Sequence, residues 1–237
     1  MKDLFGKAIL DYQTNNSPED IITETSISEA DNMSVSYLFR AFADMPQVEQ
    51  RALQLAKGKV LDVGCGAGSH SLYLQNELQL NVTSIDISTN AIEACRLRGL
   101  KNALVCDILN LENQKFDTIL LLMNGTGIFG TLSKTDKYLE KLKSLLNPNG
   151  QILIDSSDII YMFDQDKDGS YLIPVTGYYG ELTFKISYKY EKEANFPWLY
   201  LDYNTLQNAA NENGLQCELI LEGEHYDYLA RLTDLEN

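Results

Sequence analysis

The chain of 237 residues is about one and a half times the usual length of one domain, which leaves room for one large domain with appendages. Hydrophobic residues make up 44% and charged residues 22%, with 15 glycines and 5 prolines, so collagen-like, disordered and low-complexity chains are excluded. The 19 basic and 34 acidic side chains give a formal net charge of -15, which repels phosphate backbones and argues against nucleic acid as a partner.

The first twenty residues lack an apolar run long enough for a signal peptide, and no later stretch is long enough to cross a membrane. We therefore expect a cytoplasmic protein with no membrane partner. The four cysteines lie far apart without a Cys-x-x-Cys pair, which favours reduced thiols near the interior over a disulfide framework or a zinc site. They are Cys65, Cys95, Cys106 and Cys217.

An acidic turn is similar to the first half of a calcium-binding loop, with Asp164, Asp166 and Asp168 followed by Gly169. The second half does not match, because Val175 stands where such a loop needs a bidentate glutamate. We therefore predict no metal site here and an ordinary acidic turn.

From residue 57 onward, short apolar runs alternate with helical periods, which predicts a parallel sheet flanked by helices. Ser88 is expected to cap a helix that stops at Gly99, and Ser133 to cap one that runs through Leu146. Right-handed crossovers then make this an α/β, doubly wound, Rossmann-like fold. The five strands of this part, each too apolar for a solvated face, are expected at 59–63, 82–87, 103–107, 117–123 and 151–155.

The two ends of the chain differ from this centre. Residues 1–57 are typical of an N-terminal helical cap, and residues 58–237 of a main domain with an insertion at about 161–200. Residues 182–190 alternate apolar and polar side chains, which predicts an added strand that is antiparallel or lies at an edge. The elements expected to complete a seven-stranded mixed sheet are a helix at 203–213 before Gly214 and a C-terminal hairpin with strands at 216–221 and 228–232.

The sharpest motif is VLDVGCGAG at 60–68, where a strand runs into a glycine-rich turn and then into a helix. Glycines let a ligand approach the backbone closely, and the free N–H groups at a helix start suit a carboxylate or a phosphate. A dinucleotide fingerprint needs a third glycine where Ser69 stands, so the spacing argues against NAD.

This motif, with an acidic residue before a G-x-G-x-G turn, resembles the first motif of the class I S-adenosylmethionine-dependent methyltransferases. The resemblance extends over about 58–158 and implies that S-adenosyl-L-methionine is the cofactor. It implies that the acids ending the second and third strands bind the ribose and the adenine amino group, that their neighbours pack the purine, and that the fourth strand ends beside the methionine. The cofactor-binding residues so implied are Asp62, Gly64, Cys65, Gly66, Asp86, Ile87, Asp107, Ile108 and Met123.

Two of these acids have an alternative role. Asp62 could brace the glycine turn through backbone hydrogen bonds, and Asp107 could simply cap a helix or a turn. Among possible catalytic residues, Asn124 ends the fourth strand, where the resemblance implies the target atom, and His70 lies one turn into the helix after the glycine loop. A core or surface position is the alternative for His70.

Further candidates lie outside the stretch of resemblance. His225 is a possible catalytic base and Tyr226 a substrate contact, because the family fold places the turn of the last hairpin at the ligand-binding edge. Tyr37 and Arg40 share one helical face of the cap, and Arg40 could pair with a carboxylate of the cofactor or the substrate. The alternatives are an ordinary polar turn and a solvated arginine.

We therefore predict an S-adenosylmethionine-dependent methyltransferase that acts on a small molecule by in-line methyl transfer. An aminopropyltransferase of the same fold is an alternative, although its usual acidic motif is not apparent. A non-catalytic protein that binds an adenosyl ligand is another, because no residue is certain to act as a base. The sequence does not identify the methyl acceptor or the oligomeric state.

Overall fold

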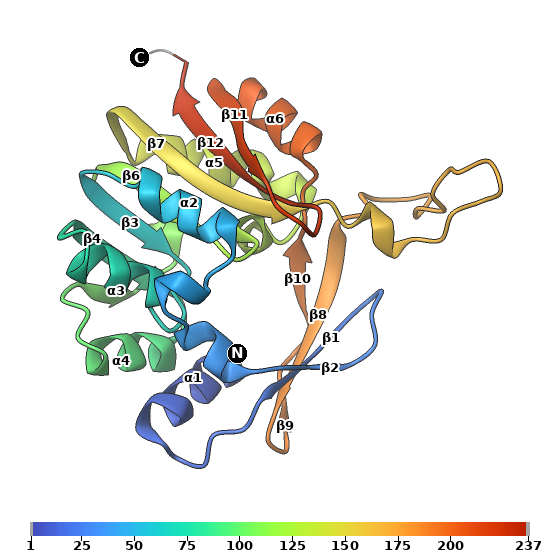
Figure 1. The fold of residues 1–237 in the computed structure, drawn as a ribbon. Coiled ribbons are helices and arrows are strands. Elements are labelled where there is room, and N and C mark those ends of the chain that lie inside the picture. The colour runs from blue at the N-terminus through green and yellow to red at the C-terminus, as the bar shows by residue number, and fades with distance from the viewer. Residues whose placement is uncertain (1, 236–237) are drawn as a thin grey trace.

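The computed structural model describes residues 2–235 and contains two sheets (Figure 1). The larger sheet has seven strands in the order β5-β4-β3-β6-β7-β12-β11. All neighbours from β5 to β7 pair in parallel, and the β11–β12 hairpin adds to β7 in the antiparallel direction. Its strands are β3 (Lys59–Val63), β4 (Asn81–Asp86), β5 (Ala103–Val105), β6 (Phe116–Leu121), β7 (Leu146–Ser157), β11 (Leu215–Glu222) and β12 (Asp227–Asp234).

This sheet confirms the predicted seven-stranded mixed architecture and every strand expected in it. The apolar runs are buried on both faces, as a central parallel strand requires. The chain leaves β3 toward β4 on one side and returns to β6 on the other, so the strand order reverses between β3 and β6. In open α/β sheets, ligands bind at the carboxyl edge beside such a switch point.

Helices cover both faces of the sheet. On one face, α2 (Gln47–Leu55) and α3 (Ser69–Asn76) bury Leu53 and Leu74. On the other, α5 (Thr135–Ser144) and α6 (Tyr203–Glu212) bury Leu142 and Leu206. The helix α4 (Thr89–Leu97) begins as predicted, because the Ser88 side chain accepts a hydrogen bond from the backbone N–H of Ala91.

One helix start was predicted wrongly. Ser133 does not cap α5, which begins at Thr135 with no side-chain cap, and the Ser133 hydroxyl lies 3.2 Å from that of Thr131 instead. The expected helix also ends too late, because Leu146 already begins β7. A serine before an apolar period marks a cap only when the chain enters the helix at that residue, and here a short 3-10 turn intervenes.

The smaller sheet lies beside the carboxyl edge of the larger one (Figure 1). Its central strand β8 (Glu181–Tyr188) pairs antiparallel with β1 and β10, so the antiparallel prediction for 182–190 is confirmed and the edge alternative is wrong. The N-terminal region is not wholly helical, because it supplies two strands as well as α1 (Leu4–Thr14). The other strands of this sheet are β1 (Ile21–Thr25), β2 (Asp31–Met33), β9 (Glu191–Lys192) and β10 (Phe196–Leu199).

Short 3-10 helices connect these elements and carry several candidate residues. They are η1 (Val35–Phe39), η2 (Phe42–Asp44), η3 (Ile108–Asn110), η4 (Gly125–Phe129), η5 (Leu132–Lys134) and η6 (Ile160–Met162). The domain boundary at residue 57 stays a prediction. Within residues 2–235, no helix is both long and apolar enough to cross a membrane.

Candidate functional site

The glycine turn lies at the carboxyl end of β3. The backbone N–H groups of Gly64 and Cys65 both donate to the carbonyl of Ile85, and the N–H of Gly66 donates to Oδ2 of Asp86 at 2.9 Å. Gly64 and Gly66 have φ values of 71° and 51°, which favour glycine. A Cβ on Gly64 would meet no atom within 4 Å, so the turn presents open backbone to a ligand.

Asp62 braces the structure behind this turn. The hydroxyl of Ser71, in the first turn of α3, donates to Oδ2 of Asp62 at 2.6 Å and lies 2.6 Å from the hydroxyl of Ser84. Asp62 is 2% exposed, and burial raises the pKa of its carboxyl group. The bond from Ser71 joins β3 to α3 and not to the backbone of the glycine turn, so the bracing alternative and direct cofactor contact by Asp62 both stay predictions.

Two acids lie at the same edge of the sheet: Asp86 is the last residue of β4, and Asp107 follows the end of β5 by two residues. Asp86 is half-buried; its Oδ1 accepts the N–H of Ser88 at 2.8 Å while Oδ2 holds Gly66, so it fixes the glycine turn relative to β4. Asp107 caps η3 by accepting the N–H of Leu109 at 2.9 Å, and this bond uses only Oδ1. Ile87 is exposed and Ile108 is buried, so the two predicted purine contacts differ in how open they are.

The turn after β6 has an unusual backbone. Met123 and Asn124 have φ values of 66° and 61°, a left-handed conformation that is rare for methionine. Asp155, at the end of β7, holds this turn: its Oδ2 accepts the N–H of Met123 at 3.0 Å and its Oδ1 that of Gly125 at 2.8 Å. One carboxylate therefore fixes the backbone on both sides of Asn124.

The side chain of Asn124 is also engaged within the protein. Its Oδ1 accepts the hydroxyl of Ser156 at 2.9 Å, and its Nδ2 donates to the carbonyl of Leu199 at 3.2 Å. These bonds join the turn to β7 and to the end of β10. They give Asn124 a positioning role, so the side chain is not free to act as the predicted catalytic group.

Burial raises the pKa of Asp155 from 3.8 to about 7, and the nearby charge of Glu49 acts in the same direction. Between these two pH values, the folded protein keeps a proton on Asp155 that the unfolded chain has lost. The stability that this carboxyl group contributes at low pH is therefore lost as pH rises from about 4 to about 7. We expect Asp155→Asn to gain stability relative to wild type over this interval, measured by urea unfolding at several pH values.

The matched control for this experiment is Asp117→Asn. Asp117 accepts the N–H of Lys59 at 2.7 Å and Nδ2 of Asn147 at 2.8 Å, and these bonds lower the pKa of its carboxyl group. Its contribution to stability is lost as pH falls, so this variant should lose stability relative to wild type above pH 4, with little further change above pH 5. If both variants follow the same pH course, the shift assigned to Asp155 is wrong.

Three charged side chains form a buried cluster between η1, α2 and α3. Nε2 of His70 lies 2.6 Å from Oε2 of Glu49, whose other oxygen pairs with Nη2 of Arg40. Nη1 of Arg40 donates to the carbonyl of Tyr37 at 2.6 Å, and the guanidinium lies 3.9 Å from the centre of the Tyr37 ring. Within the part of the chain that the structure describes, Nε of Arg40 is buried without a hydrogen-bond partner.

This cluster changes the roles expected for His70 and Arg40. Burial lowers the pKa of His70. The hydrogen bond to Glu49 and the charges of Asp62 and Glu49 raise this pKa by more than burial lowers it, so the net shift is upward. A buried histidine that is held protonated is a poor general base. The side chain of Arg40 is 6% exposed, so the solvated alternative is wrong.

The turn of the last hairpin lies at the carboxyl edge, as predicted. The N–H of Asp158, just after β7, donates to the carbonyl of Tyr226, and Asp227 pairs with Ser157 in the ladder. Tyr226 and His225 are exposed. Tyr228, two residues further along, is buried, and its hydroxyl donates to the carbonyl of Leu201 at 2.9 Å.

Sequence reasoning missed Glu49 and Asp155. Glu49 interrupts the buried face of α2 beside Val48 and Ala52, and an acid at such a position signals a buried partner. Asp155 ends the strand expected at 151–155 and lies near the end of β7, so the rule that found Asp86 applies to it equally.

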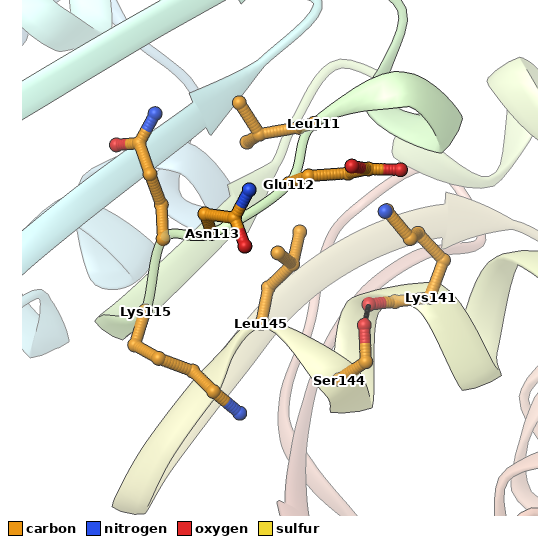
Figure 2. A pocket seen from close by; sticks show the side chains of 8 residues that line it. Leu111, Glu112, Asn113, Lys115, Lys141, Ser144 and Leu145 are labelled. Carbon is orange, nitrogen blue, oxygen red and sulfur yellow. Dashed lines mark hydrogen bonds between the residues drawn. The ribbon is translucent and has the colours of Figure 1, made fainter.

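A pocket of about 410 Å³ lies outside the site at the carboxyl edge, and Figure 2 shows the side chains that line it. Leu111 and Lys115 line it ahead of β6, and Leu145 does so ahead of β7, so it lies at the amino ends of these strands. It therefore faces away from the glycine turn and takes no part in the site described here.

The geometry at the carboxyl edge fits an adenosyl ligand: an open glycine turn on β3, acids after the next two strands and a fixed turn after β6. A model of the family described as methyltransferase domain matches residues 54–194, more than half of the chain. The chain belongs to this family. It is 44% identical to an S-adenosylmethionine-dependent methyltransferase from Bacteroides fragilis, solved in complex with S-adenosylhomocysteine. That match covers 98% of this chain and 95% of the other, with a TM-score of 0.91.

The methyltransferase therefore uses S-adenosylmethionine as its cofactor. Curated relatives match over shorter stretches. A ubiquinone biosynthesis O-methyltransferase from Pasteurella multocida is 30% identical over 129 residues, 46% of this chain and 50% of that protein. A tRNA U34 carboxymethyltransferase from Campylobacter curvus is 30% identical over 111 residues, 44% of this chain and 36% of that protein. The chain thus spans about half the length, or less, of these relatives.

Proposed function

We propose that this methyltransferase acts on a small molecule by in-line methyl transfer. The observation that carries the proposal is charge, because an excess of fifteen negative charges disfavours a polynucleotide acceptor. The names of the matched relatives do not decide the matter, since one is named for ubiquinone biosynthesis and another for a tRNA.

We propose the predicted residues for cofactor binding as follows. The open space at Gly64 and Gly66, with Cys65 between them in the turn, is the place proposed for the methionine end, while Asp86 keeps carboxylate lone pairs for ribose hydroxyls. Asp107 uses only Oδ1 for capping, which leaves Oδ2 for the adenine amino group. The remaining contacts proposed are Asp62, Ile87, Ile108 and Met123.

The cofactor supplies a methyl group on a positively charged sulfur, and transfer needs an acceptor atom in line with that bond. The protein's task is mainly positioning. Asp155 and Asn124 fix the turn beside the reacting atoms, and His70 with Glu49 fixes Arg40. We assign positioning roles to His70 and Asn124, and we retain the exposed His225 as the candidate base.

Calorimetric titration with S-adenosylmethionine, S-adenosylhomocysteine and NAD tests the cofactor site. We expect binding of both adenosyl ligands and none of NAD. Methyl-labelled cofactor is then incubated with a cell extract divided into a small-molecule fraction and an RNA fraction. Label that appears in the small molecules supports the proposal, and label confined to RNA contradicts it.

We propose that the unpaired Nε of Arg40 binds the methionine carboxylate. A buried donor without a partner is costly, and a carboxylate would satisfy it. Arg40→Lys keeps a positive charge near Glu49 but removes this donor. We expect its affinity for S-adenosylhomocysteine to fall by at least about tenfold, because a hydrogen bond to a charged group contributes about 1.5–3 kcal/mol.

The control ligand is 5′-methylthioadenosine, which has no carboxylate and should bind wild type and Arg40→Lys equally. Equal losses for both ligands would mean that the variant disturbs the site as a whole. No loss for either would assign Arg40 to the substrate instead. A specific loss for the carboxylate ligand also counts against an aminopropyltransferase, which uses a decarboxylated cofactor.

A further inference from the structure

Four tyrosines from separate segments gather at the carboxyl edge, and we call them the tyrosine wall: Tyr37, Tyr161, Tyr200 and Tyr226. Tyr161 in η6 stacks on Tyr226 of the hairpin turn, with ring centres 4.7 Å apart. Tyr200 immediately follows β10, next to Leu201, whose N–H donates to the hydroxyl of Ser156. Tyr37, in η1, lies under the guanidinium of Arg40.

The wall hydroxyls differ from those of the structural tyrosines. Within residues 2–235 none of these four hydroxyl groups has a hydrogen-bond partner, although Tyr200 is half-buried. Tyr37, Tyr161 and Tyr226 are 43%, 46% and 60% exposed. By contrast, the hydroxyls of Tyr178, Tyr179, Tyr188, Tyr203 and Tyr228 all donate to protein oxygens. The wall therefore offers ring faces and free hydroxyl groups to a ligand.

Carboxylates dominate the charge around this wall. Burial raises the pKa of Tyr37, and the charges of Glu49, Asp155 and Asp227 raise it further while Arg40 opposes them. Burial raises the pKa of Tyr200 to about 12, with Tyr161 and Asp155 acting in the same direction. The two nearby cations, Arg40 and His70, are both paired with Glu49, so their charge is already partly balanced.

We propose that the methyl acceptor is an amine of a small molecule, taken up as an ammonium ion against the tyrosine wall and the carboxylate of Asp227. This inference rests on the proposed function. Tyrosine ring faces attract ammonium groups, and neighbouring carboxylates strengthen that attraction. An anionic acceptor would face the same carboxylate and be repelled.

The reaction requires the ammonium ion to lose one proton, which the candidate base His225 accepts, and this loss frees the nitrogen lone pair. That pair forms the new C–N bond as the S–C bond breaks, and the electrons of the broken bond remain on sulfur. The methylated nitrogen is then positively charged and can release a second proton if it carries one. The wall hydroxyls can accept hydrogen bonds from the amine before transfer and from the charged product after it.

The test uses tetramethylammonium chloride as the probe, titrated into the full chain saturated with S-adenosylhomocysteine at constant ionic strength. Binding is followed by NMR of ring-labelled tyrosines, with sodium benzoate as the anionic comparison. We expect tetramethylammonium to shift the wall tyrosines and benzoate to leave them unchanged. Tyr200→Leu should weaken tetramethylammonium binding about fivefold, as loss of one cation–ring contact predicts.

Two variants serve as controls. Tyr200→Phe keeps the ring face and should bind the probe like wild type, while Tyr190→Leu alters a fully exposed tyrosine between β8 and β9 and should change nothing. The proposal is overturned if tetramethylammonium does not bind, binds no better than benzoate, or binds Tyr200→Leu as well as wild type. Retained binding of S-adenosylhomocysteine in those cases leaves the proposed function intact, whereas its loss in wild type would refute that function first.

The decisive chemical comparison is a matched pair of acceptors. 2-Phenylethylamine and 2-phenylethanol have the same carbon skeleton and differ only in the group that would take the methyl. Transfer of labelled methyl to the amine in preference to the alcohol supports the inference. Preference for the alcohol contradicts it.

Discussion

Gly66→Val is expected to abolish binding of S-adenosylhomocysteine. The φ of Gly66 is 51°, which a β-branched residue adopts only with strain, and the nearest atom to a Cβ there is Cδ1 of Ile9 at 4.0 Å. The new side chain would thus enter the open space that the turn presents to the cofactor. We expect a loss of more than about a hundredfold in affinity by calorimetry, equivalent to about 2.8 kcal/mol.

Backbone strain at Gly66 must be distinguished from obstruction of the cofactor space, and Gly99→Val is the control for strain. Gly99 also has a positive φ, 94°, and a Cβ at this position would meet no atom within 4 Å, but it lies at the far end of α4. Both variants should lose some stability, and only Gly66→Val should lose the ligand. Equal binding by the two proteins would show that the glycine turn does not hold the cofactor.

The central sheet could be predicted because its signal is local. Buried parallel strands need continuous apolar runs, and KVLDV at 59–63 became β3 without a shift in either boundary. Strands β1 and β2 could not be found in this way. IITET and DNM are short and half exposed, and they become strands by pairing with each other and, for β1, with β8 about 160 residues later.

The same distinction applies to the site. Asp86 and Asp107 could be placed because strand ends share one edge of a parallel sheet. The pairing of Glu49 with His70 could not, because it joins two helices through a contact that no sequence pattern encodes. Tyr37 and Tyr226 of the tyrosine wall were expected from the sequence as substrate contacts, whereas Tyr161 reaches Tyr226 only through the folded insertion.

Glu49→Leu is expected to cost the largest amount of stability of any change discussed here. It would leave the buried cations Arg40 and His70 without their shared anion, and such a loss typically costs about 3–5 kcal/mol. The measurement is urea unfolding. Glu93→Ala is the control, because Glu93 is an exposed acid on α4 and its loss should change stability by less than about 0.5 kcal/mol.

The pH dependence of Glu49→Gln separates charge from shape, because glutamine keeps the volume and a hydrogen-bonding group. In wild type the pKa of His70 is raised above 6.5, so its stabilising protonation is complete below that pH and is lost as pH rises through the folded value. Burial raises the pKa of Glu49, but the bond to His70 and the charges of His70 and Arg40 lower it by more, so its net shift is downward. The ionised Glu49 therefore contributes to stability above about pH 4.5. The free energy of unfolding of wild type should therefore exceed that of Glu49→Gln most between about pH 5 and pH 6.5, and this difference should narrow at higher pH. A gap independent of pH would mean that the cluster holds Arg40 by packing and not by charge.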